Sequence, residues 1–228
     1  MRTWCRDEAA GAPQTPAIRV VLFTDIEGST ALTERLGDAE ARGLLRLHER
    51  IVRAELRAHG GAEIKTLGDG FLAAFFSATQ ALACAAGIQR AFAAYNWRGA
   101  EPLRVRIGLN AGEPIAEDDD LFGTTVIVAA RVTAQACGGE ILVTDVVRLL
   151  AAGKRFRFAP RGTSVLRGFE DEVSLHEVDW RAAPDDGPVG TLPRRELPAM
   201  PAMTRPGDPL AAVAVLAAGV TVAAGAAM

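Results

Sequence analysis

The sequence predicts an α+β fold with a ferredoxin-like split βαβ core, in which an antiparallel sheet carries helices on one face. Short β-branched runs and longer amphipathic stretches follow one another in the order strand, helix, strand, strand, helix, strand. A glycine-flanked turn between the second and third strands indicates a hairpin. The 228 residues, 49% hydrophobic and 23% charged, suit one globular domain of ordinary size with extensions.

The first strand and helix are expected near the N-terminus. Residues 18–24, IRVVLFT, form a β-branched run bounded by turn signals, which is typical of a buried strand. A helix is expected over residues 29–59, where leucine, isoleucine and valine recur near the helical period. Asp38 is a candidate N-cap, and Gly60 and Gly61 are expected to end the helix.

The remaining elements alternate in the same way. Residues 62–66 and 71–76 are strand-like runs around the turn Leu67-Gly68-Asp69-Gly70, which predicts a hairpin. The further expected elements are a helix over 77–95, a strand over 103–111, a helix over 124–136, a strand over 140–143 and a closing strand pair within 163–178.

Both ends of the chain differ from this core. Residues 1–17 are polar and then loop-like, which predicts a disordered arm and no secretory signal peptide. Residues 181–209 are dense in proline and are expected to form a linker. Residues 210–228 contain no charged side chain, and as a helix they would span about 28 Å, close to a bilayer core. We favour a membrane-spanning helix here, with an alanine-rich low-complexity tail as the alternative.

Charge and cysteine content narrow the class of protein. The net charge of -3 argues against a nucleic-acid binder, which normally carries a basic surplus. Three cysteines without CxxC spacing indicate reduced thiols and a cytoplasmic domain. Arginines precede the apolar segment, which also favours a cytoplasmic domain. The three histidines are widely separated, so they are expected at the surface or in packing positions and not as metal ligands.

Two acidic residues stand at positions where the topology brings segments together. Asp25 ends the first strand, and Asp69 lies in the hairpin turn. In a split βαβ core the first strand lies beside the hairpin, so the two carboxylates are expected to converge and to suit two hard cations. The turn at Gly28, Ser29 and Thr30 leads into a helix and would offer backbone N–H groups to phosphate. Taken singly, each aspartate is best explained as a turn residue. Taken together, and with Gly28, Ser29, Thr30, Gly68 and Gly70 nearby in the two motifs, they favour a metal site.

Four motifs in the chain resemble a known family. FTDIEGST, IKTLGDGF, RIGLNAGE and DLFGTTVIVAAR look like the blocks of class III adenylate/guanylate cyclase catalytic domains, in the family's order and spacing. The resemblance covers residues 18–180 and implies the class III nucleotide cyclase fold. It implies that Asp25 and Asp69 bind two metal ions per site, Mg²⁺ or Mn²⁺, together with the backbone carbonyl of Ile26.

The resemblance also assigns substrate-binding side chains. Lys65 matches the lysine that donates to adenine, and Asp120 matches the aspartate that accepts from the adenine amino group. Arg131 matches the arginine that stabilises the phosphates in the transition state. Arg167 stands where the family usually has a lysine that contacts the terminal phosphates, and arginine differs from lysine in reach and geometry.

Two positions depart from the family pattern. Ile127 occupies the place of an asparagine that orients the ribose, four residues before the arginine. Isoleucine cannot hydrogen-bond, and loss of one such contact commonly lowers the rate by about 10²–10³. Alternatively, Ile127 is a core residue of an amphipathic helix. Asn110 stands where the family often has histidine.

The implied activity is that of an adenylate cyclase acting on ATP in a head-to-tail homodimer. The ribose 3′-hydroxyl attacks the α-phosphorus in line and pyrophosphate leaves. The lysine–aspartate pair favours adenine, because guanine reverses the donor and acceptor edges that these residues would meet. Two alternatives stay open, namely a nucleotide-binding regulatory module with little turnover, which Ile127 motivates, and a guanylate cyclase.

Overall fold

The computed structural model describes residues 17–97 and 101–181. The predicted N-terminal arm, the proline-rich linker and the C-terminal apolar segment lie almost entirely outside these residues. Within the described part, no helix combines the length and the apolar character that crossing a bilayer requires.

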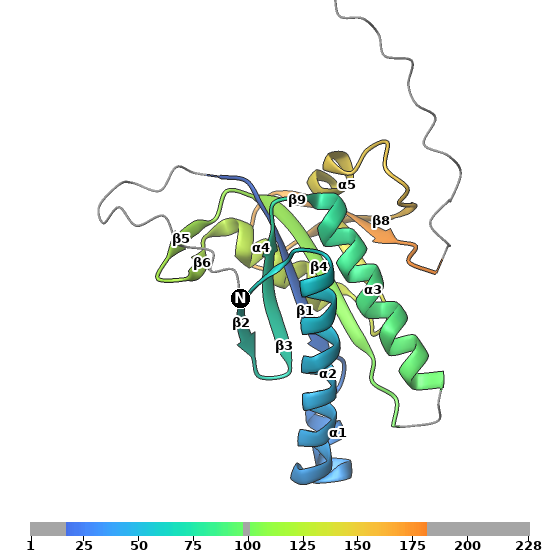
Figure 1. Cartoon of the computed structure of the whole chain (residues 1–228). Helices are drawn as coiled ribbons and strands as arrows, with labels where there is room; N and C mark the ends of the chain where they lie inside the picture. The colour runs from blue at the N-terminus through green and yellow to red at the C-terminus, as the bar shows by residue number, and fades with distance from the viewer. Residues whose placement is uncertain (1–16, 98–100, 182–228) are drawn as a thin grey trace, which may run out of the picture. The chain divides into compact units, whose positions relative to one another are not determined.

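The described elements alternate between strands and helices along the chain (Figure 1). They are β1 (Arg19–Ile26), α1 (Ser29–Leu36), α2 (Asp38–Ala58), β2 (Ala62–Leu67), β3 (Gly70–Phe75), α3 (Ala78–Trp97), β4 (Val105–Gly112), β5 (Ile115–Glu117), β6 (Asp120–Phe122), α4 (Thr124–Gln135), β7 (Ile141–Thr144), α5 (Asp145–Leu150), β8 (Phe158–Val165) and β9 (Glu172–Val178).

The strands form a main sheet in the order β2-β3-β1-β4-β7-β9-β8. The first four strands pair antiparallel with one another and have the order of a split βαβ core, so the predicted fold class is confirmed. The sheet departs from an antiparallel arrangement at β4 and β7, which pair in parallel. Beyond β7, the closing pair of β9 and β8 is antiparallel and begins five residues earlier than expected, at Phe158.

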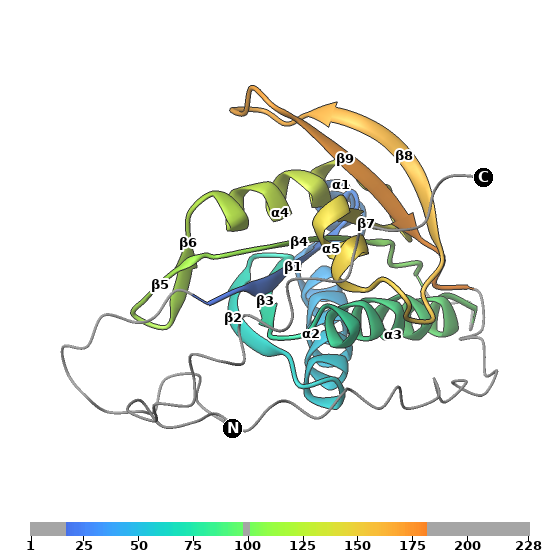
Figure 2. The same ribbon diagram turned by 90° about the horizontal axis from the view of Figure 1, so that it is seen from above.

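The long helices of the split βαβ core, α2 and α3, lie on one face of the sheet as predicted, and α4, which follows the core in the chain, covers the other face. Val20 and Leu22 of β1 belong to the core cluster that includes α2, α3 and α5, whereas Val21 packs with Ala129 of α4. Figure 2 shows α4 on one side of the sheet and α2 and α3 on the other. A strand buried on both faces reads as a continuous apolar run, as β1 does.

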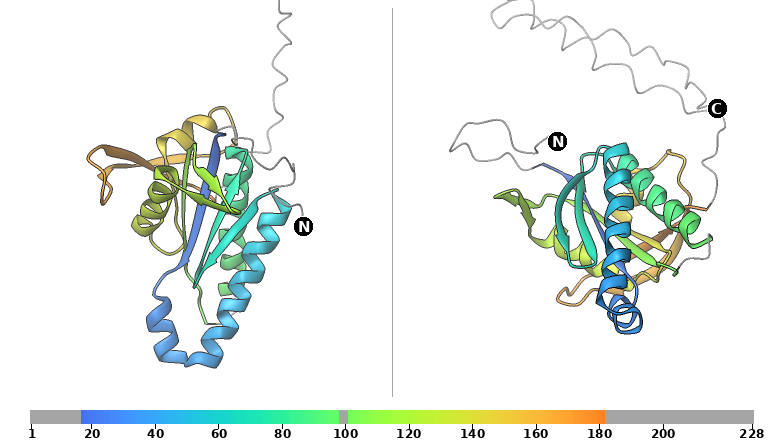
Figure 3. Two further views of the ribbon diagram at one scale, coloured as in Figure 1. Left: turned by 90° about the vertical axis from the view of Figure 1, so that its left-hand side faces the viewer. Right: turned by 60° about the horizontal axis from the view of Figure 1, so that its bottom comes forward.

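The predicted helix 29–59 is two helices, α1 and α2, which meet at an angle at one end of the molecule (Figure 3). Gly37 separates them with a φ of 78°, a conformation that glycine adopts without the steric penalty of a side chain. Gly37 is therefore the N-cap of α2, and Asp38, the predicted cap, is its first residue. Asp38 and Glu40 place negative charge at the positive end of the helix dipole.

Three short elements were not predicted from the sequence, namely the two strands of the β5–β6 hairpin and the helix α5. The two residues of the hairpin turn, Asp118 and Asp119, have φ angles of 49° and 62°. Two positive φ angles in succession are typical of a type I′ turn, which aspartate tolerates better than most residues do. The hairpin matters for the site because β6 begins at Asp120.

His48 and Cys84 are buried in the core, and His48 takes the packing position that was one of the two expected for the histidines. The His48 ring lies between Phe71 and Phe92, with ring centroids 5.5 Å and 5.6 Å away. Burial lowers the pKa of His48 to about 4, so the ring is neutral near pH 7. Burial likewise raises the pKa of the Cys84 thiol to about 12, which leaves it unreactive.

Candidate functional site

The end of β1 and the turn between β2 and β3 lie against each other. A Cβ atom on Gly70 would stand 2.2 Å from the carbonyl oxygen of Thr24 and 3.6 Å from the Cα atom of Asp25. The backbone N–H of Phe71 donates to Oγ1 of Thr24 at 3.2 Å. The close approach requires glycine at position 70. It brings the segments that carry Asp25 and Asp69 together, as the split βαβ topology predicts.

A pocket of ≈ 340 Å³ opens beside this junction. It is lined by the end of β1, by α1, by the first part of α2 and by the hairpin turn, through Ile26, Ser29, Thr30, Leu32, Thr33, Ala41, Leu44, Leu45, Gly68 and Asp69. The residue before α1, Gly28, has a φ of 70° and provides no side-chain cap. The first N–H groups of α1 therefore have no side-chain partner from the cap, and a helix N-terminus in this condition favours an anion.

Asp25 forms an ion pair that the sequence analysis did not foresee. Arg106 of β4 pairs with Asp25 across the strands, and its Nε and Nη2 atoms lie 2.7 Å and 2.5 Å from Oδ2 of Asp25. Both side chains are partly exposed. Arg106 opens the motif RIGLNAGE, but its partner depends on the register between β1 and β4, which the sequence alone does not define.

Lys65 and Asp120 meet although 55 residues separate them in the chain. Nζ of Lys65 lies 2.5 Å from Oδ2 of Asp120, and the backbone N–H of Leu121 donates to Oδ1 at 2.8 Å. The hydrogen bond from Lys65 holds the pKa of the Asp120 carboxyl below its usual range. The Phe122 ring lies 5.6 Å from the ammonium group. The pair predicted to contact adenine is thus assembled within one chain.

The two remaining predicted residues lie on the surface. Arg131 is exposed on α4, and Arg167 is exposed in the turn between β8 and β9. Neither arginine forms an ion pair with any residue that the structure describes. The residue beside Arg167, Leu166, is buried against α4 in the cluster that holds Val128.

Ile127 is not a core residue, so the alternative explanation for its presence is wrong. Its side chain is 47% exposed. Ile127 and Arg131 are four residues apart on α4, so both lie on the same exposed side of the helix. An isoleucine therefore stands one turn before the arginine, on a surface that water reaches.

The donor chemistry at the end of β1 fits a hard divalent cation. Asp25 and Asp69 carry carboxylate oxygens, and Ile26, which lines the pocket, would contribute its carbonyl oxygen. Magnesium commonly takes only one or two carboxylates from a protein and completes its shell with water and phosphate oxygens. In the described ranges, 17–97 and 101–181, no group of three or more His, Cys, Asp or Glu side chains is placed to hold a metal. Substrate oxygens would therefore supply much of the shell.

Comparison with known families decides the classification of the chain. The model of the adenylate and guanylate cyclase catalytic domain matches residues 13–179. The chain belongs to this family. The match contains all four motifs and both aspartates, so the resemblance to class III cyclases is confirmed.

Relatives of the cyclase domain include proteins named for either nucleotide. The adenylate cyclase of Neurospora crassa is 34% identical over an alignment of 172 residues, and the match covers 62% of this chain and 7% of that protein. A solved adenylate/guanylate cyclase/hydrolase from Silicibacter pomeroyi is 29% identical with a TM-score of 0.65, over 72% of this chain and 97% of that chain. The guanylyl cyclase Cya2 is 27% identical with a TM-score of 0.65, and the match covers 72% of this chain and 92% of that chain. The chain spans no more than 32% of the length of the first curated relatives that it matches.

Proposed function

We propose that this domain is an adenylate cyclase that converts ATP to cyclic AMP and pyrophosphate. One observation carries the proposal: in a member of the cyclase family, the end of β1 with Asp25 meets the hairpin turn with Asp69 beside a pocket. In the reaction the ribose 3′-oxygen forms a bond to the α-phosphorus, the bond from that phosphorus to the pyrophosphate oxygen breaks, and the hydroxyl proton passes to solvent. The uncatalysed barrier lies in assembling and neutralising these charged groups.

Asp25, Asp69 and the carbonyl of Ile26 would hold the divalent cations, Mg²⁺ or Mn²⁺, two per site. When bound, such ions acidify the ribose hydroxyl and neutralise the triphosphate. Because Arg106 occupies Oδ2 of Asp25, a cation has to share or displace this contact. Arg106 would then be free to meet a phosphate oxygen nearby.

The other positive groups act on the phosphates. The backbone N–H groups at Gly28, Ser29 and Thr30 would bind phosphate oxygens at the N-terminus of α1. Arg131 would stabilise the charge that develops at the α-phosphate, and Arg167 would hold the terminal phosphates. Both arginines are exposed and are thus available to a substrate.

Lys65 and Asp120 would recognise the base. A lysine ammonium only donates and a carboxylate only accepts, which matches the ring nitrogen and the amino group of adenine. In the nucleotide-free chain the two side chains satisfy each other, at 2.5 Å. Binding of adenine would replace this one contact by two.

We further propose that the active form is a head-to-tail homodimer with sites at the interface. Arg131 projects from an exposed surface of α4, whereas Asp25 lies at the end of β1 and Asp69 lies in the turn between β2 and β3. Ile115, Phe122 and Ile127 are exposed apolar side chains on the β5–β6 hairpin and α4. Exposed apolar groups around polar site residues suit an interface between subunits.

We keep the proposal that the domain is cytoplasmic and anchored to the membrane by residues 210–228. The length and the uncharged composition of that segment support it. Fractionation of the full chain and of a chain ending at Asp208 tests the anchor. The full chain is expected in the membrane fraction and the shorter chain in the soluble fraction, and equal distribution of the two would contradict the proposal.

The second candidate is a nucleotide-binding regulatory module with little turnover. It is favoured by Ile127, which places an apolar side chain on the exposed side of α4 that also holds Arg131. A guanylate cyclase is the third candidate, since guanylyl cyclase Cya2 is among the structural relatives.

One assay separates these candidates. The purified full chain is incubated with ATP or GTP and with Mg²⁺ or Mn²⁺, and cyclic AMP and cyclic GMP are measured by mass spectrometry. We expect metal-dependent formation of cyclic AMP in excess of cyclic GMP. Excess cyclic GMP would indicate a guanylate cyclase. ATP binding without either product would indicate the regulatory module.

A further inference from the structure

The strand that carries Lys65 contains one residue more than its partner strand requires. Glu63 pairs with Ala73 and Lys65 pairs with Leu72, so two steps along β2 correspond to one step along β3. Ile64 is the additional residue, and the pattern is that of a β-bulge.

The bulge decides which face of the sheet Lys65 occupies. Ala73 packs in the core cluster of α2 and α3, whereas Leu72 packs with Ala129 of α4. Directly opposed residues on neighbouring strands share a face. Glu63 therefore faces α2 and Lys65 faces α4, although an even spacing of two would ordinarily place them on the same face.

A regular strand would remove Lys65 from the site. If β2 continued from Glu63 without a bulge, Ile64 would pair with Leu72 and Lys65 with Phe71. Phe71 belongs to the core cluster on the α2 side, so Lys65 would lie across the sheet from Asp120. A shift by one residue is a realistic risk here, because among the strands of residues 17–97 and 101–181 β2 is at the edge of the sheet and pairs with β3 alone.

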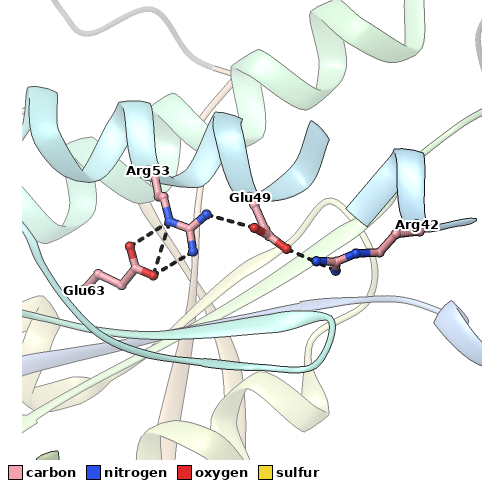
Figure 4. A network of polar contacts seen from close by, with 4 residues as sticks. All are labelled: Arg42, Glu49, Arg53 and Glu63. Carbon is pink, nitrogen blue, oxygen red and sulfur yellow. Dashed lines mark hydrogen bonds and ion pairs between the residues drawn. The ribbon is translucent and has the colours of Figure 1, made fainter. Parts of the chain in front are cut away.

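An ion-pair network fixes β2 just before the bulge (Figure 4). Arg53 of α2 binds Glu63 through two nitrogens, with Nε 2.9 Å from Oε2 and Nη2 3.0 Å from Oε1. Its third nitrogen, Nη1, donates to Glu49 at 2.8 Å, and Arg42 donates to the other oxygen of Glu49 at 3.3 Å. The Arg53 guanidinium also lies 5.2 Å from the centroid of the Phe71 ring.

The geometry of this network is favourable for positioning a strand. Isolated surface ion pairs contribute little to stability, but bidentate arginine–carboxylate pairs within a network are the exception. Arg53 uses every nitrogen of its guanidinium on a neighbouring carboxylate. Glu63 is thereby held on the α2 face while Ile64 is anchored among apolar side chains on the α4 face.

We propose that Arg53 and Glu63 are positioning residues for base recognition, because their ion pair fixes the register of β2 so that the bulge delivers Lys65 to Asp120. The inference rests on the proposed role of Lys65 in binding adenine. It adds how the fold positions the Lys65 side chain for that role. Neither Arg53 nor Glu63 is expected to touch the nucleotide.

The first test measures the position of Lys65 without any turnover. The carboxyl group of Asp120 is titrated by NMR in the full chain, in Glu63→Gln and in Lys65→Met. Lys65 lowers the pKa of Asp120, so the pKa of Asp120 in Lys65→Met is the value expected when the contact is lost. We expect the pKa in Glu63→Gln to rise toward this value. Arg53→Met removes the other partner of the Arg53–Glu63 ion pair, so it should raise the pKa of Asp120 in the same way. This variant replaces Glu63→Gln in the test if Glu63→Gln fails to fold.

Arg42→Met is the matched control. It removes another arginine from the same network but leaves the contacts of Arg53 with Glu63 in place. The pKa of Asp120 should keep its wild-type value in this variant. If Asp120 titrates in folded Glu63→Gln and Arg53→Met as it does in the wild type, the inference is wrong.

The second test uses kinetics with both nucleotides. In Glu63→Gln we expect the KM for ATP to rise about tenfold, with kcat changed less than about twofold, because contacts to a non-reacting base bind ground and transition state alike. The KM for GTP should stay the same. In a Lys65→Met background, Glu63→Gln should have no further effect on selectivity, since the pair acts through Lys65. If Glu63→Gln lowered the selectivity for ATP in the Lys65→Met background as much as it does in the wild type, the inference would be wrong. If the chain makes no cyclic nucleotide, the proposed function fails, and the NMR titration still decides this inference.

Discussion

Arg106 of β4 donates from Nε to Oδ2 of Asp25 across the β1–β4 pair, at 2.7 Å. The carboxylate proposed to hold a cation is therefore already neutralised by a neighbouring cationic side chain. Any divalent ion has to compete with a charge-assisted hydrogen bond, which is among the stronger contacts available to a side chain. Affinity for metal in the absence of nucleotide should accordingly be low.

Replacing Arg106 should expose this competition. In Arg106→Gln we expect Mn²⁺ to bind about tenfold more tightly without nucleotide, because the carboxylate loses its positive partner. Electron paramagnetic resonance titration of free Mn²⁺ measures the change. Arg104→Gln is the control, since Arg104 pairs with Glu27 at 3.5 Å just beyond the ends of the same two strands. Unchanged affinity in Arg106→Gln would show that the pair does not limit metal binding.

The two aspartates can be tested by changes that preserve shape. Asp25→Asn and Asp69→Asn keep a polar side chain of the same size but remove the charge that a cation needs. We expect cyclic AMP formation to fall by at least about 10²–10³ in each, with circular dichroism unchanged. A variant that kept full activity under saturating Mg²⁺ or Mn²⁺ would refute the assignment of that residue as a metal ligand.

Much of the fold could be predicted because its long elements have a clear period. The apolar run of β1 and the long helical stretches of α2 and α3 can be recognised in the sequence. The order of the elements then places the end of β1 next to the hairpin turn. Strands of three residues, such as β5 and β6, are too short to show a period. The break between α1 and α2 depends on one glycine, Gly37, which adopts a φ of 78° and which the helical period on either side does not reveal.

Site contacts that depend on register could not be predicted in the same way. Lys65 and Asp120 were assigned from the resemblance of motifs, whereas the ion pair of Arg106 with Asp25 requires the exact alignment of β1 and β4. The bulge at Ile64 likewise reverses the face that alternation along β2 would give to Lys65. The exposure of Ile127 depends on how α4 packs against the sheet.

Restoring asparagine at position 127 should raise turnover. Ile127 is exposed one turn before Arg131, so Ile127→Asn adds a polar group on the side of α4 proposed to face the ribose. We expect kcat for cyclic AMP formation to increase about tenfold or more, with a small change in stability because the site is on the surface. Steady-state kinetics of the two proteins measure this. Equal rates would mean that position 127 does not contact the substrate in the active form.

The buried His48 predicts a loss of stability in mild acid. Burial between Phe71 and Phe92 lowers its pKa from 6.5 to about 4, although Asp69 and Glu49 partly oppose the shift. Nε2 of His48 has no hydrogen-bond partner among the described residues, so a proton there would be poorly solvated. Between these two pH values the unfolded chain binds more protons than the folded chain, so the free energy of unfolding falls as the pH falls.

The corresponding variant is His48→Leu, which fills the site without a titrating group. Urea unfolding of the wild type should lose about 3 kcal/mol between pH 6.5 and pH 4 through His48, and the variant should lack this contribution. Between pH 7 and pH 8 the two proteins should show parallel dependences, because His48 is neutral in both the folded and the unfolded wild-type chain. If the two curves stay parallel down to pH 4, then His48 is protonated in the folded protein and the ring must have access to water or to a carboxylate.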